Sequence, residues 1–140
     1  MAEIHPILKK DCQLVGHFDL CHLLLMNDAS YPWLILVPDR DDMTEIYQLS
    51  EQDQVQLLRE SSCVSRMLNA IFSADKINIA ALGNVVPQLH IHHIARYRDD
   101  LAWPKPIWGY AMAVPYDAES LRETVDKLRG ELLGQLGFSV

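Results

Sequence analysis

The stretch "VPQLHIHHIARYRDD", residues 86–100, holds three histidines within four positions: His90, His92 and His93. The chain has six histidines in all, so half of them gather here. An imidazole has an unperturbed pKa of about 6.5, so near neutral pH it offers a lone pair for attack and a proton for a departing group. Neighbouring imidazoles therefore point to chemistry at a small anionic group such as a phosphate.

A β-strand over residues 88–96 would bring two of these rings together. Alternate side chains of a strand share a face, so Gln88, His90 and His92 are expected on one side. Same-side neighbours lie about 6–7 Å apart along a strand, close enough for two imidazoles to touch one phosphate. The opposite side is mostly apolar and is expected to face the core. His93 lies on that side and is interpreted as a hydrogen-bonded structural histidine.

The elements before this strand are marked by apolar runs. "CHLLLMND" (21–28) and "PWLILVPD" (32–39) predict two buried antiparallel strands joined by a tight turn. Ser50 is a capping residue for a long helix over residues 51–73, whose apolar side chains recur at helical spacing. Residues 4–10 are expected to form a short helical turn.

After the long helix, the sequence predicts three further strands followed by a C-terminal helix. Residues 76–82 predict a strand that ends at "GN", residues 88–96 the next strand, and residues 107–114 a further one. An amphipathic helix is expected over residues 117–133, with Asp117 at its start. Because no helix separates the first two strands, the pattern predicts an α+β fold with a mostly antiparallel sheet.

Length and composition bound the class of protein. The 140 residues suit a single domain, residues 1–140, and 49% apolar with 22% charged residues is a globular composition. The net charge of −7 argues against nucleic acid as a partner, because binding it needs a basic surface. Cys12, Cys21 and Cys63 are expected to be free thiols. Without a signal-like or membrane-length apolar run, a cytoplasmic protein with no membrane partner is expected.

Three segments together resemble the histidine triad (HIT) family of nucleotide hydrolases and transferases. They are "LLLMNDASYPWLILVP", the long helix after it, and "GNVVPQLHIHHIAR", and the resemblance covers roughly residues 12–100. It implies an antiparallel sheet of about five strands, with a long helix after the first hairpin and a C-terminal helix, usually in a homodimer. It also implies a small-molecule nucleotide substrate, cleaved at its α-phosphate through a nucleotidyl-histidine that water resolves, without a metal or other cofactor.

The resemblance also assigns site residues by position. His90 stands where the family has its nucleophile, and His92 stands at the third triad position, near the phosphate oxygens or the leaving group. A protonated His92 would stabilise charge on those oxygens. Asn84 corresponds to a polar residue near the phosphates, and Asn27 and Asp28 to residues near the ribose. The leaving group is expected to be that of a dinucleoside polyphosphate or a nucleoside phosphoramidate.

Two residues depart from the family pattern. Gln88 replaces the first triad histidine, and Trp33 stands where many members have a further histidine. Gln88 can orient a phosphate by hydrogen bonds but cannot shuttle a proton. A catalytically weak or inactive nucleotide-binding module on the same fold is therefore the alternative. A metal site on His90 and His92 is a third reading, although the sequence shows no third and fourth ligand for it.

Other polar and aromatic residues near the triad receive general roles. Arg96 and Arg98 are expected to pair with the aspartates at 99 and 100 as a solvated charge cluster, with a phosphate contact as the alternative. Trp108 belongs to a Pro-rich loop and is expected to pack in the core or an interface, or else to cap a pocket. The other histidines, given surface or structural roles, are His5, His17 and His22.

Overall fold

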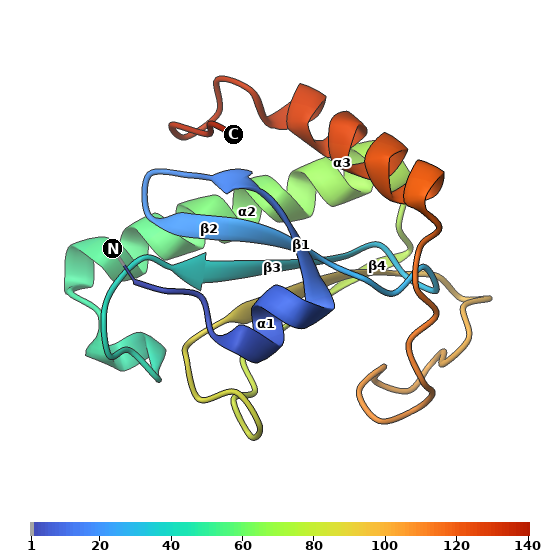
Figure 1. The fold of residues 1–140 in the computed structure, drawn as a ribbon, viewed down its shortest axis with the longest axis horizontal. Coiled ribbons are helices and arrows are strands. Elements are labelled where there is room, and N and C mark those ends of the chain that lie inside the picture. Colours follow the sequence, from blue (N-terminus) through green and yellow to red (C-terminus); the bar gives the residue numbers. More distant parts are fainter. Residues whose placement is uncertain (1) are drawn as a thin grey trace.

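The computed structural model describes residues 2–140 and has the α+β architecture that the sequence predicts (Figure 1). Within these residues, five strands form one antiparallel sheet in the order β1-β2-β3-β5-β4. The strands are β1 Cys12–His17, β2 Cys21–Met26, β3 Trp33–Pro38, β4 Lys76–Ala80 and β5 Ile91–Arg96. The helices are α1 Pro6–Asp11, α2 Glu51–Phe72 and α3 Ala118–Leu132, with a 3-10 turn, η1, at Ile46–Gln48.

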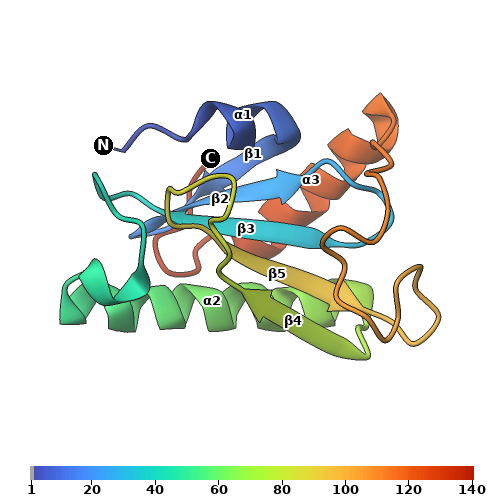
Figure 2. The same cartoon turned by 90° about the horizontal axis from the view of Figure 1, so that it is seen from below.

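The sheet is covered on both faces. Figure 2 shows α2 lying along one face while α1 lies on the opposite side. On the α2 face, Val64 and Leu68 of α2 and Leu128 of α3 pack with strand residues into the larger core cluster. On the other face, Leu8 of α1 and Ile107, from the loop after β5, pack against Trp33 and its neighbours. Successive side chains of β5 therefore point alternately into the core cluster on the α2 face and into the one on the α1 face.

Both long helices begin at capping residues that the sequence predicts. Ser50 Oγ accepts a hydrogen bond from the backbone N–H of Asp53 at 3.1 Å. Asp117 Oδ1 accepts one from the N–H of Ser120 at 2.8 Å. These bonds satisfy N–H groups that the first helical turn leaves free. The predicted hairpin, the long helix and the C-terminal helix are all confirmed.

Strand β1 has no counterpart in the sequence prediction. Gln13 and Leu14 are exposed, so the strand lacks the continuous apolar run that identifies β2 and β3. Its pairing with β2 is also interrupted by a register shift between Leu14 and Gly16. A side chain at Gly16 would collide with the ring of Phe138, so this close approach requires glycine.

The predicted strand over residues 107–114 is wrong. Gly109 has a φ of 77°, a left-handed conformation that breaks an extended run, and the segment forms turns and irregular backbone. The segment is held by β2 and the turn after it: the N–H of Ala29 donates to Val114 O at 2.6 Å. Asn27 Oδ1 accepts from the N–H of Tyr116 at 2.9 Å. These contacts fold the loop back over the sheet and replace strand pairing.

The predicted strand over residues 88–96 is shorter than expected, since β5 begins at Ile91. The N–H of Leu89 donates to Met43 O at 2.9 Å, so the chain contacts a neighbouring loop before it enters the sheet. Strand β4 likewise ends at Ala80, two residues earlier than predicted.

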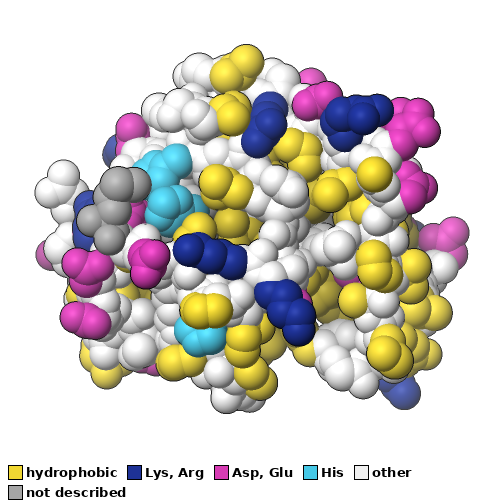
Figure 3. Space-filling view, viewed as in Figure 1, with side chains coloured by type: hydrophobic (Ala, Val, Ile, Leu, Met, Phe, Trp, Pro, Cys, Tyr) yellow, Lys and Arg dark blue, Asp and Glu magenta, His cyan; other side chains and the backbone are white. Residues whose placement is uncertain are grey.

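The surface that Figure 3 shows is mixed in character, with hydrophobic side chains gathered at the lower right, where Figure 1 draws the loop between β5 and α3. Exposed hydrophobic residues of that loop include Leu101, Tyr110, Met112 and Val114. Within residues 2–140, no helix has the length and apolar character needed to cross a membrane.

Candidate active site

His90 lies one residue before β5 and is held by the backbone. Its Nδ1 is 2.7 Å from the carbonyl oxygen of Gln88. A carbonyl only accepts hydrogen bonds, so Nδ1 carries a proton. In the neutral ring the lone pair is then on Nε2, which has no hydrogen-bond partner among the described residues. Among residues 2–140, the buried side-chain polar atoms without a partner are His22 Nε2 and Trp108 Nε1, so His90 Nε2, which is not one of them, retains some contact with solvent.

His92, the second residue of β5, has the opposite tautomer. The indole Nε1 of Trp33 lies 2.9 Å from His92 Nδ1. An indole N–H can only donate, so Nδ1 is the acceptor and the proton of the neutral ring is on Nε2. Burial, followed by the neighbouring His90 and His93, lowers the pKa of His92 from 6.5 to about 3. Burial thus favours a neutral His92 ring with an N–H at Nε2, and it opposes the protonated form considered from the sequence.

The two rings lie side by side, as strand geometry predicts. Their centroids are 5.0 Å apart and their planes are inclined by 69°. His90 presents a lone pair at Nε2 and His92 presents an N–H at Nε2. Such a pair can attack a phosphorus atom with one ring and hydrogen-bond an oxygen of the same group with the other.

Two tryptophans surround the ring of His92. The centroid of Trp33 lies 5.6 Å from it, and that of Trp108 lies 5.3 Å from it. Both tryptophans also line a cavity of about 420 Å³, which reaches Asn27 and Asp28 at the end of β2. The cavity therefore connects the predicted ribose-binding residues with the aromatic wall beside His92. The pocket-capping alternative for Trp108 agrees with this position.

Asn27 and Asp28 line the cavity and also hold its wall. Asn27 Oδ1 accepts from the N–H of Tyr116, and Asp28 Oδ1 accepts from the N–H groups of Ser30, at 3.0 Å, and Val114, at 3.3 Å. Both side chains thus fix the segment that closes the cavity, while remaining next to any molecule that enters it.

Gln88 and Asn84 lie in different surroundings on the side of His90. The side chain of Gln88 accepts from the N–H of His5 at 2.8 Å and donates to the carbonyl of Glu3 at 2.9 Å. It therefore ties down the N-terminal segment, while its carbonyl orients His90. A second cavity, of about 220 Å³, is lined by His90, Gln88 and residues 44–47 and 81–83. Asn84 is exposed beside this cavity and is not among its lining residues.

His93 and Arg96 occupy structural positions. His93 points to the α2 face, where its Nε2 is 2.7 Å from Ser61 Oγ and its Nδ1 is 3.1 Å from the carbonyl of Ile91. The sequence interpretation of a satisfied structural histidine agrees with these contacts. Arg96 does pair with Asp100, at 2.7 Å, but both side chains are buried, so the predicted solvated cluster is wrong for this pair.

The burial of Arg96 has a physical reason. The loop after β5 folds back over the guanidinium, which also donates to Asn78 Oδ1 at 2.8 Å and to the carbonyl of Lys105 at 2.9 Å. Because these partners accept hydrogen bonds from all three guanidinium nitrogens, the alternative role of Arg96 in phosphate binding is excluded. The orienting role of Trp33 is absent from the sequence interpretation, because only the pairing of β3 with β5 brings its indole N–H to His92.

Fold and site together define an α+β protein with two adjacent imidazoles at the start of a central strand, one of which, His90, lines a surface cavity. A family model described as the HIT domain matches residues 8–99. The chain therefore belongs to the histidine triad family, whose members are generally nucleotide hydrolases or transferases. A search of curated proteins found no match.

Solved structures agree with this assignment. The chain is 47% identical to a histidine triad protein from Bradyrhizobium japonicum, covering 92% of this chain and 96% of that one, with a TM-score of 0.90. A histidine triad protein from Marinobacter aquaeolei is 47% identical over 94% of this chain and 96% of its own, with a TM-score of 0.92. A protein from Sulfolobus tokodaii, described as a hypothetical histidine triad nucleotide-binding protein, shares the fold at 14% identity, 95% and 96% coverage and a TM-score of 0.66.

Proposed function

We propose that the chain is a hydrolase or transferase acting at the α-phosphate of a nucleoside phosphate derivative, with His90 as nucleophile. The observation that supports this most strongly is the complementary tautomers of the two rings. Gln88 O fixes the proton of His90 on Nδ1, and Trp33 fixes the proton of His92 on Nε2. One ring is thereby ready to attack and the other to donate a hydrogen bond.

The proposed reaction has two steps. The lone pair of His90 Nε2 attacks the α-phosphorus, a P–N bond forms, and the bond from phosphorus to the leaving group breaks. Water, or another acceptor, then attacks the same phosphorus; the P–N bond breaks, the nucleotide leaves and the acceptor's proton passes to solvent. His92 Nε2–H hydrogen-bonds a phosphoryl oxygen or the leaving group as negative charge builds up in each step.

The cavity of about 420 Å³ supports a nucleoside as the bound group. Its size is in the range of small-molecule sites, and Trp33 and Trp108 offer aromatic surface to a base. Asn27 and Asp28 supply oxygen acceptors for hydroxyl groups such as those of a ribose. Dinucleoside polyphosphates and nucleoside phosphoramidates both have an α-phosphate that could then meet His90. The similarity to a protein described as nucleotide-binding is in line with this substrate class.

We further propose that the whole chain is one domain that acts as a homodimer on a small nucleotide substrate. In the sheet order, β4 is an edge strand, and its Ile79 is 54% exposed. An open edge with an exposed aliphatic side chain is suited to pairing with a second chain. Asn84 and Gln88, which line or flank the cavity beside His90, are placed near the phosphates in this proposal.

A nucleotide-binding module without turnover is the second candidate. One observation favours it: the side chain of Gln88 is engaged with the N-terminal segment, so the first triad position provides neither a proton nor a charge at the phosphate. In this case the nucleotide would bind in the same cavity and leave unchanged.

Turnover of a substrate panel separates the two candidates. Adenosine and guanosine phosphoramidates and polyphosphates are incubated with the natural protein, with His90→Ala and with His5→Asn. The last variant also removes one imidazole but retains a side chain able to cap α1, as His5 does. We expect turnover by the natural protein and by His5→Asn, a nucleotidyl adduct on His90, and no turnover by His90→Ala.

Equal turnover by the natural protein and His90→Ala would eliminate His90 as nucleophile. Tight nucleotide binding without turnover by any variant would favour the binding module.

A further inference from the structure

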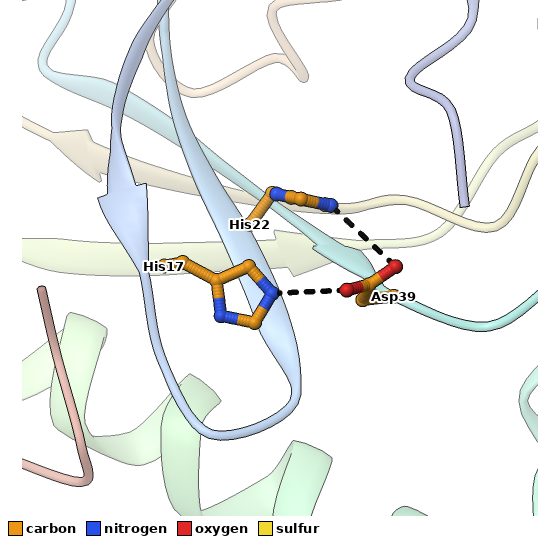
Figure 4. A group of neighbouring side chains, drawn as sticks. All are labelled: His17, His22 and Asp39. Atoms are coloured by element: carbon orange, nitrogen blue, oxygen red, sulfur yellow. Dashed lines mark hydrogen bonds and ion pairs between the residues drawn. The ribbon is translucent and has the colours of Figure 1, made fainter. Parts of the chain in front are cut away.

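Three side chains far from each other in sequence meet beside the β1–β2 turn. His17 ends β1, His22 is the second residue of β2, and Asp39 directly follows β3. Figure 4 shows both imidazoles turned toward the same carboxylate. His17 Nε2 is 3.3 Å from Asp39 Oδ2, and His22 Nε2 is 3.8 Å from Asp39 Oδ1. One donor atom from each residue lies within 4.8 Å of the other two.

The hydrogen bond of His17 leaves a lone pair directed at Asp39. His17 Nδ1 is bonded to the carbonyl oxygen of Phe18, so the proton of its neutral ring is on Nδ1. Its Nε2 then presents a lone pair to the carboxylate of Asp39. His22 Nε2 is sealed from solvent and has no hydrogen-bond partner in the described residues. A proton or a cation between His17 Nε2 and the carboxylate would stabilise this arrangement, and a cation could also provide a partner for the buried Nε2 of His22.

We propose that His17, His22 and Asp39 form a zinc site, with water as the fourth ligand. Zinc lies about 2.0–2.2 Å from nitrogen and oxygen ligands, which places tetrahedral donors roughly 3.3–3.5 Å apart. The imidazoles of His17 and His22 lie 3.3 and 3.8 Å from different oxygens of Asp39, and one donor atom from each residue lies within 4.8 Å of the other two. Side-chain rotation that draws the three donors closer together would bring them to this spacing. Two imidazoles with a single carboxylate favour zinc over calcium or magnesium, which prefer oxygen ligands. The side chain of His17 is 31% exposed, so solvent reaches the group.

The ligands are held by their own supporting contacts. The carbonyl of Phe18 orients His17, and the N–H of Ala2 donates to Asp39 Oδ1 at 2.6 Å. Such second contacts fix the orientation of metal ligands. Glu60, fully buried on α2, accepts the N–H groups of Leu20 and Cys21, each at 2.9 Å, and so fixes the turn between the two histidines. The group shares no residue with the pair His90–His92.

Zinc binding by the full chain tests the proposal. The protein is treated with a chelator, dialysed against zinc, and analysed for bound metal and thermal midpoint. We expect one zinc per chain and a higher midpoint with zinc. Asp39→Asn, which keeps an acceptor for the N–H of Ala2, and His17→Gln should each weaken binding by at least about tenfold, the lower end for changes around a zinc site.

The controls separate this group from other ligands. Asp41→Asn removes a nearby exposed carboxylate and should leave zinc binding unchanged, and so should His92→Ala. The spectrum of bound Co²⁺ should report a four-coordinate site in the natural protein and change in His17→Gln, a variant at a partly exposed position that should fold normally. Absence of bound zinc in the natural protein, equal binding by Asp39→Asn and His17→Gln, or loss of zinc in His92→Ala would each overturn the proposal.

Discussion

Replacing Trp33 with Phe removes one hydrogen bond and keeps most of an aromatic ring. The indole N–H that donates to His92 Nδ1 at 2.9 Å is lost. Trp33 is 9% exposed and His92 is 5% exposed, so water has little access to the nitrogen that loses its partner. We therefore expect Trp33→Phe to act on both the stability of the fold and the tautomer of His92.

The magnitude follows from the burial of this bond. An unsatisfied buried acceptor costs about 1–3 kcal/mol, so the free energy of unfolding should fall by about that amount. The proton of His92 is also no longer fixed on Nε2, so a fraction of the rings will carry it on Nδ1. If the pair works as proposed, kcat falls about tenfold for every 1.4 kcal/mol by which the unproductive tautomer is favoured.

Trp108→Phe is the matched control for this experiment. Its ring also contacts His92, but its Nε1 is buried without a partner, so removing that N–H breaks no hydrogen bond. Urea unfolding should show Trp33→Phe to be about 1–3 kcal/mol less stable than Trp108→Phe. Long-range ¹H–¹⁵N spectra should show protonation of His92 Nε2 in the natural protein and a mixture in Trp33→Phe. Equal stabilities together with an unchanged His92 spectrum would refute the orienting role of Trp33.

Three further outcomes concern stability measured by urea unfolding. Ser61→Ala leaves the buried Nε2 of His93 unsatisfied and should cost about 1–3 kcal/mol, whereas Ser62→Ala on the same helix should cost little; equal effects would contradict the hydrogen bond. Burial lowers the pKa values of the histidines at 92 and 93 from 6.5 to about 3 and about 4. As the pH falls, these histidines therefore become protonated in the unfolded chain at a higher pH than in the folded protein. The free energy of unfolding should therefore fall as pH drops from 6.5 to 4, by up to about 1.4 kcal/mol per pH unit for each ring, and a flat profile would contradict this. Arg96→Lys removes a buried two-pronged contact and should cost about 3 kcal/mol or more, while Arg98→Lys at the surface should be neutral; similar costs would show that burial of Arg96 is not decisive.

Local sequence patterns predict the parts of the fold that depend on one segment at a time. Apolar runs identify β2 and β3, and helical spacing after Ser50 identifies α2. The shared side of His90 and His92 follows from strand alternation, and it holds even though the strand begins only at Ile91. These features need no knowledge of distant contacts.

Contacts that depend on strand register or on the path of a loop cannot be predicted from local sequence patterns. Trp33 meets His92 because β3 pairs with β5 in one particular register, with Trp33 opposite Ile94. Likewise, Arg96 is buried because the loop after β5 folds back over it, with contacts from Asp100 and Lys105. The meeting of His17 with Asp39 depends on three strands ending at one corner of the sheet. One sequence, read without an alignment to related sequences, contains no direct signal for such pairings.

Gln88 links the N-terminal segment directly to His90. Its main chain sets the direction in which the neighbouring imidazole points, and its side chain is fastened to the backbone at Glu3 and His5. Through Gln88, the backbone at Glu3 and His5 is therefore connected to the proposed nucleophile, His90. If His90 attacks as proposed, a fusion or tag that displaced these first residues would change the orientation of its ring and, with it, the rate of the reaction, at a distance from the bound substrate.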